Sequence, residues 1–289
     1  MPIELRHLAL ALVVVIVWGT NFVVIRLALD AFPPFLLGAI RFAFAALPAM
    51  LFLPRPQVPA GTLAAYGLAI GAGQFALLYL AMSGHISPGL TSLVVQTQAF
   101  FTIGLSMWLT GERVRPYQLA ALALAVAGIV VIGAHADPTV TLLGLVLVLG
   151  AAFCWAIGNT VSRRASAPNM LAYVVWSSPF AVPPLLALSL AFEGPERMVE
   201  ALGHAGVVGW ASALWQSVGN TLFGYSVWAW LLSRYPSATV APLALLVPVF
   251  GMGAAAWYLG ESLPAWKVVA AALVLGGLAL NTFYPRLRG

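Results

Sequence analysis

The chain has 289 residues, of which 62% are hydrophobic and 7% are charged. Soluble domains carry charge on about a quarter of their residues, so this composition excludes a soluble protein and indicates one that lies in a lipid bilayer. The net charge of +5 would suit nucleic acid, but the basic residues sort along the chain by the side of the membrane on which they fall. We therefore expect no nucleic-acid partner.

Ten apolar runs follow one another along the chain, and each is close to the ~20 residues that a helix needs to cross the hydrocarbon core. Their residues do not alternate strictly, so helices are indicated and a β-barrel is not. We predict an all-α integral membrane protein with ten transmembrane helices. The predicted helices cover residues 7–29, 34–53, 62–82, 87–109, 117–134, 141–163, 170–192, 206–232, 237–259 and 265–285.

The Lys and Arg residues predict the orientation of these helices. If the N-terminus is cytoplasmic, nine of them fall on the inner side and three on the outer side, so the positive-inside rule places both termini in the cytoplasm. The inner residues are Arg6, Arg55, Arg113, Arg115, Arg163, Arg164, Arg234, Arg286 and Arg288, and the outer residues are Arg26, Arg197 and Lys267.

The chain repeats part of its own sequence. Residues 87–114 return without a gap as residues 236–263, and the two copies carry the pairs Gly111-Glu112 and Gly260-Glu261 at an offset of 149 positions. Glycine commonly ends helices, and charges that mark function usually lie deeper in the membrane. We therefore interpret each Gly-Glu pair as a helix end followed by an interfacial carboxylate, in preference to a substrate site.

A second pair of matching positions lies further upstream, where Trp18 and Arg26 have the same spacing as Trp155 and Arg163. Together the matches predict two repeats, residues 1–137 and 138–289, with five helices each. Because five is odd, the second repeat enters the membrane from the opposite side and the repeats are inverted. Inverted repeats in transporters commonly hold the substrate near the bilayer midplane between them, so we expect a central cavity.

Neutral amides and aromatic residues gather at the expected depth of that cavity. Trp18 and Asn21 are three residues apart, while Gln216 and Asn220 are four apart, so each pair is expected to share a helix face. Amides would hydrogen-bond a polar head group while aromatic rings, with Tyr79 and Trp228 as gate or wall, hold an apolar part. Interhelical hydrogen bonding is the alternative use of such residues. The candidate substrate-binding residues are Trp18, Asn21, Gln74, Tyr79, Gln98, Trp155, Asn159, Gln216, Asn220 and Trp228.

Charged residues inside the predicted helices are few. Arg41 is the most deeply placed, and a structural role that ties its helix in place is favoured over attraction of a substrate carboxylate. No Asp or Glu lies in the middle of a predicted helix, so the sequence offers no obvious proton relay or sodium site. It contains no glycine-rich phosphate loop, and Cys154 is its single cysteine. We expect no catalytic residues, no cofactor and no metal.

Several of these residues also form a family pattern. The run from Trp18 to Phe22, then Pro34 and Arg41, and the two Gly-Glu pairs resemble the EamA type of the drug/metabolite transporter superfamily, over nearly the whole chain. The resemblance is strongest to the bacterial aromatic amino acid exporters of the YddG type. The chain departs from the pattern where Ala99 stands at the position that matches Pro248.

This resemblance implies a secondary transporter in the bacterial inner membrane that exports aromatic and other hydrophobic amino acids by alternating access. Its partners would be the amino-acid substrate and the lipid bilayer, and a monomer would suffice. Export of drugs or other amphipathic metabolites is the alternative within transport. An intramembrane enzyme would need an acid, base or nucleophile constellation at depth, which the sequence does not display, and a purely structural scaffold would not need amides at one depth.

Overall fold

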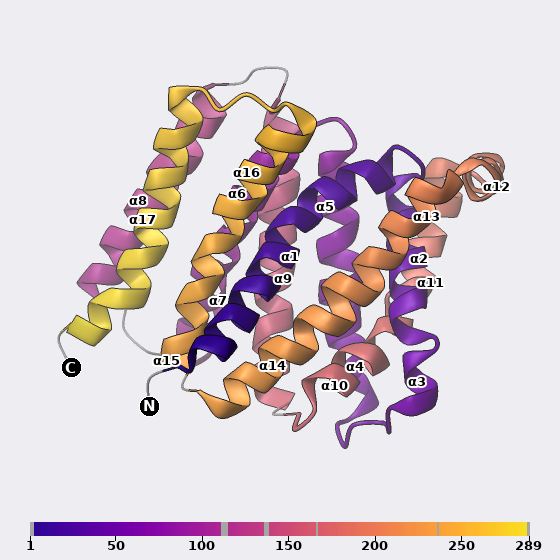
Figure 1. Ribbon diagram of the computed structural model, residues 1–289, viewed down its shortest axis with the longest axis horizontal. Coiled ribbons are helices and arrows are strands. Elements are labelled where there is room, and N and C mark those ends of the chain that lie inside the picture. The colour runs from indigo at the N-terminus through magenta and orange to yellow at the C-terminus, as the bar shows by residue number, and fades with distance from the viewer. Residues whose placement is uncertain (1–2, 111–114, 136–138, 166, 236, 288–289) are drawn as a thin grey trace.

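The computed structural model describes residues 3–110, 115–135, 139–165, 167–235 and 237–287, and the regular elements in these ranges are helices (Figure 1). In chain order they are α1 Leu5–Leu29, α2 Pro34–Ala46, α3 Ala49–Phe52, α4 Ala60–Tyr66, η1 Gly67–Gln74, α5 Phe75–Met82, α6 Pro88–Val94, η2 Val95–Thr97, α7 Gln98–Thr110, α8 Pro116–Ala134, α9 Leu142–Ala165, α10 Met170–Ser177, η3 Ser178–Phe180, α11 Val182–Leu188, η4 Ser189–Glu193, α12 Pro195–His204, α13 Gly206–Trp215, η5 Gln216–Phe223, α14 Gly224–Arg234, α15 Ser237–Val240, η6 Ala241–Leu246, α16 Val247–Leu259 and α17 Ala265–Leu287.

Nine helices in the described ranges are long and apolar enough to cross a membrane. They correspond to all the predicted transmembrane helices except the eighth, at residues 206–232. The structure forms that helix as α13, η5 and α14 in succession, but its middle carries the buried polar residues Gln216, Ser217, Asn220 and Thr221. These polar residues lower the mean hydropathy of the eighth helix, so it is not among the nine. Ten membrane-crossing helices therefore remain a prediction.

Two of the helices contain a π-helical segment at matching places in the sequence. The segments η1 and η5 have eight residues each and start at Gly67 and Gln216. These starts are 149 positions apart, which is also the offset between the two Gly-Glu pairs. π-Helical turns are rare and often occur at functional sites. Their recurrence at the repeat offset supports the repeat prediction, although the inversion itself stays a prediction.

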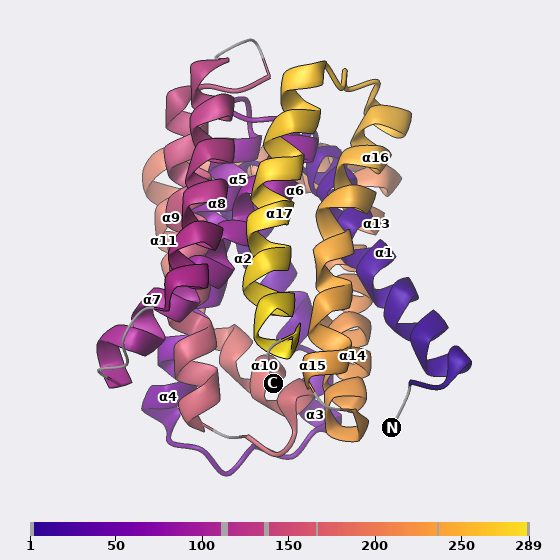
Figure 2. The ribbon, with the colours of Figure 1, turned by 90° about the vertical axis from the view of Figure 1, so that its left-hand side faces the viewer.

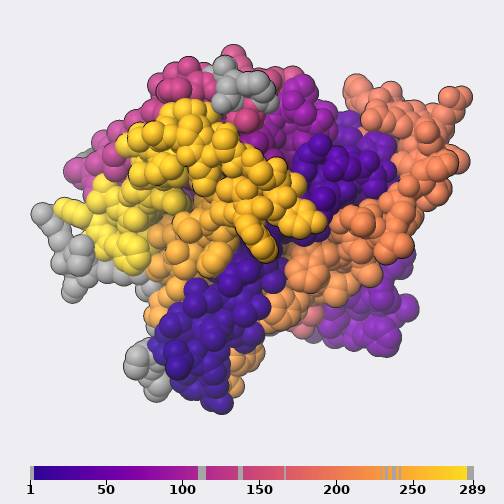
Figure 3. Space-filling model, turned by 45° about the horizontal axis from the view of Figure 1, so that its top comes forward, coloured from indigo at the N-terminus to yellow at the C-terminus, as the bar shows by residue number. Residues whose placement is uncertain are grey.

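The helix packing also recurs between the two predicted repeats. The first helix, α1, packs against α16, and the corresponding helix of the second repeat, α9, packs against α7. Figure 3 shows α1, in indigo, lying between the orange helices of the second repeat, so the two halves of the chain interleave. The start of α1 and the end of α17 lie at one end of the bundle, which we call the terminal face, and α12 lies at the opposite face (Figure 1).

Helices α8 and α17 form a close pair at one side of the bundle (Figure 2). Glycine allows this approach, because a Cβ atom added to Gly128 would lie 3.0 Å from the carbonyl oxygen of Ala270, and one added to Gly277 would lie 3.2 Å from the backbone nitrogen of Ala125. In lipid, helices associate largely through such close backbone contacts. The pair therefore depends on small residues along its seam.

Replacement of Gly277 with leucine should force these two helices apart. The cost of overpacking is about 1–3 kcal/mol, which we expect to appear as a lower thermal midpoint of the purified protein in detergent. Gly276→Leu is the matched control, since a Cβ atom at Gly276 meets nothing within 4 Å. Equal midpoints for the two variants would show that the seam is not tightly packed.

Candidate functional site

A cavity of about 670 Å³ lies at the centre of the helix bundle. Its volume falls within the range of about 300–1,000 Å³ that is usual for small-molecule sites. Residues from both predicted repeats line it. The sequence-predicted site residues among them are Trp18, Asn21, Gln74, Gln98, Trp155, Asn159, Asn220 and Trp228.

The cavity extends from the middle of the bundle toward the terminal face. Ser162 near the end of α9, Met170 at the start of α10 and Thr282 near the end of α17 belong to its lining. None of the described lining residues belongs to a loop at the opposite face. The helix α6, in which every residue is buried, contributes none of these lining residues. The cavity is therefore directed toward the terminal face.

Aromatic rings form one wall of the cavity. The ring centroid of Trp18 lies 5.1 Å from that of Trp228 and 5.7 Å from that of Tyr225. The indole N–H of Trp18 donates to the backbone carbonyl oxygen of Asn220 at 3.2 Å, within the π-helical segment η5. Because this N–H is already used, the rings present an apolar surface that suits an apolar group.

The amides that line the cavity fall into two groups. The side-chain N–H of Asn159 donates to Gln98 Oε1 at 2.9 Å, which links α9 to α7 across the repeats. This contact is the interhelical hydrogen bonding that the sequence analysis gave as the alternative to substrate binding. By contrast, Asn21 Oδ1 and Gln74 Oε1 are buried and accept no hydrogen bond from the described residues. A buried unpaired acceptor costs about 1–3 kcal/mol, so this pair of oxygens favours a ligand that donates N–H or O–H groups.

Tyr79 and Gln216 do not line this cavity, and in this respect the sequence prediction was wrong. Arg41 Nη1 donates to the Tyr79 hydroxyl at 2.8 Å, and the Tyr79 hydroxyl donates to Gln216 Oε1. Gln216 precedes Asn220 by four residues in the π-helical segment, but of the two only Asn220 belongs to the lining. Tyr79 and Gln216 instead serve the structural arrangement of Arg41.

The sequence also missed aromatic residues of the lining, namely Phe22, Tyr66, Phe75 and Tyr225. Tyr225 follows Asn220 by five residues, a spacing that matches a π-helical turn and not an α-helical one. Nothing in the sequence marks the π-helical segments directly, since no polar residue of the first segment recurs at the matched position of the second. Phe75 directly follows Gln74, at the end of the first π-helical segment.

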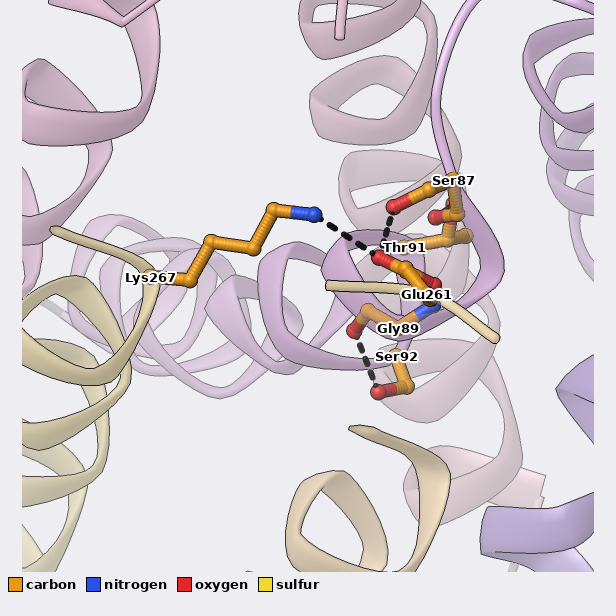
Figure 4. Close-up of polar contacts among 6 residues, drawn as sticks. All are labelled: Ser87, Gly89, Thr91, Ser92, Glu261 and Lys267. Carbon is orange, nitrogen blue, oxygen red and sulfur yellow. Dashed lines mark hydrogen bonds and ion pairs between the residues drawn. The ribbon is translucent and has the colours of Figure 1, made fainter. Parts of the chain in front are cut away.

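A buried ion pair holds three helices together at the opposite face (Figure 4). Gly260 ends α16 in the left-handed conformation, with φ of 67°. The side chain of Glu261 then turns inward, where its Oε1 accepts from Lys267 Nζ at 3.1 Å and from the Ser87 hydroxyl. Its Oε2 accepts from the backbone N–H of Gly89 at 3.0 Å, in the first turn of α6. We call these four residues, Ser87, Gly89, Glu261 and Lys267, the Glu261 cluster.

Glu261 lies in the loop after α16, as predicted, but its side chain is buried in the Glu261 cluster. The side chain of Glu261 is 7% exposed and that of Lys267 is 0% exposed. A carboxylate at the start of a helix satisfies free backbone N–H groups and interacts favourably with the helix dipole. The glycine half of the prediction was right, since Gly260 does end its helix. The first copy, Gly111-Glu112, lies outside the described residues.

Comparison with known proteins identifies the family. The profile of the EamA-like transporter family matches residues 5–134 and, a second time, residues 142–283. The chain belongs to this family. It is accordingly a multi-pass membrane transporter of the EamA type, and the family relationship indicates a transporter in preference to an enzyme.

This EamA transporter aligns with curated relatives over nearly the full length of both chains. The "Probable amino-acid metabolite efflux pump" of Salmonella typhimurium is 41% identical over 96% of this chain and 95% of its own. The protein of the same name in Escherichia coli K12 is 40% identical over the same shares. The "Probable terminal-alkyne amino-acid exporter" of Streptantibioticus cattleyicolor is 26% identical over 92% of this chain and 90% of its own.

A solved crystal structure shares the fold of the EamA transporter. It matches with a TM-score of 0.62 over 98% of this chain and 97% of that chain, at 20% sequence identity. At that identity the likeness shows the fold alone. Within the described ranges, no group of three or more His, Cys, Asp or Glu residues is placed to hold a metal ion.

Proposed function

We propose that this protein exports amino acids with aromatic or other apolar side chains. The observation that carries the proposal is a cavity that combines an aromatic wall with the side chains of Asn21 and Gln74, whose amide oxygens are buried and unpaired among the described residues. An ammonium group supplies up to three N–H donors, and hydrogen bonds to a charged group are worth about 1.5–3 kcal/mol each. The rings of Trp18 and Trp228 would take the apolar side chain.

The names of the relatives support the same class of substrate. Two relatives at 41% and 40% identity are named as amino-acid metabolite efflux pumps. The third name, of an exporter of an alkyne-bearing amino acid, describes a substrate with an apolar side chain. The direction of transport, outward, is taken from these names. The preference for aromatic side chains rests on the cavity wall.

Alternating access is the proposed mechanism of transport. The cavity is directed toward the terminal face, which the positive-inside rule assigns to the cytoplasm, while the Glu261 cluster holds the opposite face together. We propose that the contacts of the Glu261 cluster break when the cavity opens to the opposite face.

The test is a flux assay with the purified protein in liposomes. A panel of radiolabelled amino acids is loaded at the side of the terminal face, and their movement is followed with and without a pH gradient. We expect phenylalanine, tryptophan and leucine to move faster than through protein-free liposomes, and serine and aspartate not to. No flux of any amino acid would overturn the proposed function, and competition by apolar cations alone would favour export of drugs.

A further inference from the structure

Arg41 carries a buried positive charge without a carboxylate partner in the described part of the chain. The residue is 1% exposed. Arg41 forms no ion pair with the described residues, whereas the buried Lys267 is paired with Glu261. Removal of a charge from water costs several kcal/mol, which is usually offset by an opposite charge. The structure supplies hydrogen bonds to this guanidinium but no negative charge.

The guanidinium also retains unused hydrogen-bonding capacity. Nη1 donates to the Tyr79 hydroxyl at 2.8 Å and Nη2 donates to Thr221 Oγ1 at 3.2 Å, so both partners are uncharged hydroxyls. The third nitrogen, Nε, is buried and donates to no acceptor in the described residues. A guanidinium has five N–H groups in a planar fork that matches a carboxylate. The neutral partners therefore hold Arg41 in place but leave part of its hydrogen-bond donors, and its charge, without a partner in the described residues.

Two aromatic rings lie against the guanidinium, and the closer is that of Phe75, since the ring centroid of Phe42 is 5.5 Å from Cζ. The Cζ atom of Arg41 is 3.8 Å from the ring centroid of Phe75. A second, small cavity of about 10 Å³ lies beside Arg41, which is about the room that one water molecule needs. Phe75, Tyr66 and Tyr225 line both this small cavity and the central one. These three rings thus form the partition between Arg41 and the central cavity.

We propose that Arg41 binds the carboxylate of the transported amino acid, and that the ring of Phe75 moves aside to admit it. This inference rests on the proposed function. The substrate's ammonium group would remain with Asn21 and Gln74, and Phe75 directly follows Gln74 in the chain. With the ring displaced, Arg41 would bind the carboxylate while Asn21 and Gln74 bind the adjacent ammonium group, and the buried charge of Arg41 would gain the partner that the described residues do not provide.

Binding of an amino acid and of its amide tests this assignment. The probes are phenylalanine and phenylalaninamide. If another amino acid is carried faster, that amino acid and its amide take their place. Dissociation constants are measured by calorimetry on the purified protein. The wild type should bind the acid at least tenfold more tightly than the amide. In Arg41→Gln the affinity for the acid should fall at least tenfold while that for the amide stays within about threefold, which also shows that the variant is folded.

The matched control is Arg26→Gln, because Arg26 is an exposed arginine paired with Asp30. It should leave both affinities unchanged. Phe75→Ala should raise the affinity for the acid relative to the amide, since it removes the partition, and this variant provides a second readout if Arg41→Gln does not fold. An Arg41→Gln variant in which both affinities fall equally, or neither falls, would overturn the inference. A wild type that binds neither probe would instead overturn the proposed function.

Discussion

Glu261→Ala should lower the free energy of unfolding by about 3–5 kcal/mol, the usual cost of leaving one partner of a buried ion pair alone. The variant leaves the ammonium group of Lys267, which is 0% exposed, without its carboxylate. It also removes the acceptor of the Gly89 N–H at the start of α6. The measurement is thermal or denaturant unfolding of the purified protein in detergent.

Two further variants separate the ion pair from other effects of the substitution. Glu200→Ala removes an exposed carboxylate of the short helix α12 and should change stability by less than about 0.5 kcal/mol. The double variant Glu261→Gln with Lys267→Met removes both charges and should recover much of the lost stability, because an apolar replacement of a buried pair is often neutral. If Glu261→Ala were as stable as Glu200→Ala, the Glu261 cluster would not hold the opposite face together.

Asn21→Ala and Gln74→Ala should each reduce amino-acid flux by at least about tenfold, since hydrogen bonds to charged groups are worth about 1.5–3 kcal/mol and 1.4 kcal/mol is a factor of ten. Neither variant should lose stability, because the two acceptor oxygens have no partner in the described residues. Flux in liposomes and thermal midpoints in detergent provide the two measurements.

The contrast with Asn159→Ala makes this prediction sharper. Asn159 donates to Gln98 Oε1 at 2.9 Å, so its removal should cost about 0.5–1.5 kcal/mol of stability. Gln57→Ala, at an exposed loop position, is the control for flux and stability alike. If Asn21→Ala and Gln74→Ala transported normally, the ammonium site would lie elsewhere in the cavity.

The sequence predicted the helices well because their signal is local. The ninth predicted helix, residues 237–259, corresponds to α15, η6 and α16, which run from Ser237 to Leu259. An uninterrupted apolar run of about 20 residues leaves a membrane chain no alternative to a helix. The left-handed Gly260 was predictable for the same reason, since a glycine at a helix end is a local feature.

The tertiary partners were not predictable from these local rules. Glu261 meets Ser87 and Gly89, more than 170 positions away in the chain, and nothing in its own segment indicates that it is buried. Gln216 was assigned to the cavity because it precedes Asn220 by four residues. Its Oε1 accepts from the Tyr79 hydroxyl instead, a contact between residues 137 positions apart that a count within one helix cannot reveal.

The accessibility of one engineered cysteine tests most directly the claim that amino acids bind in a cavity open to the cytoplasm. Ser162 lines the cavity near the end of α9, and the variant Ser162→Cys would be made with Cys154→Ala so that it carries the single thiol. In oriented membrane vesicles, a membrane-impermeant thiol reagent should modify it from the cytoplasmic side only, and phenylalanine should slow the reaction. Modification from the outer side, or a rate that no amino acid of the panel alters, would contradict the account.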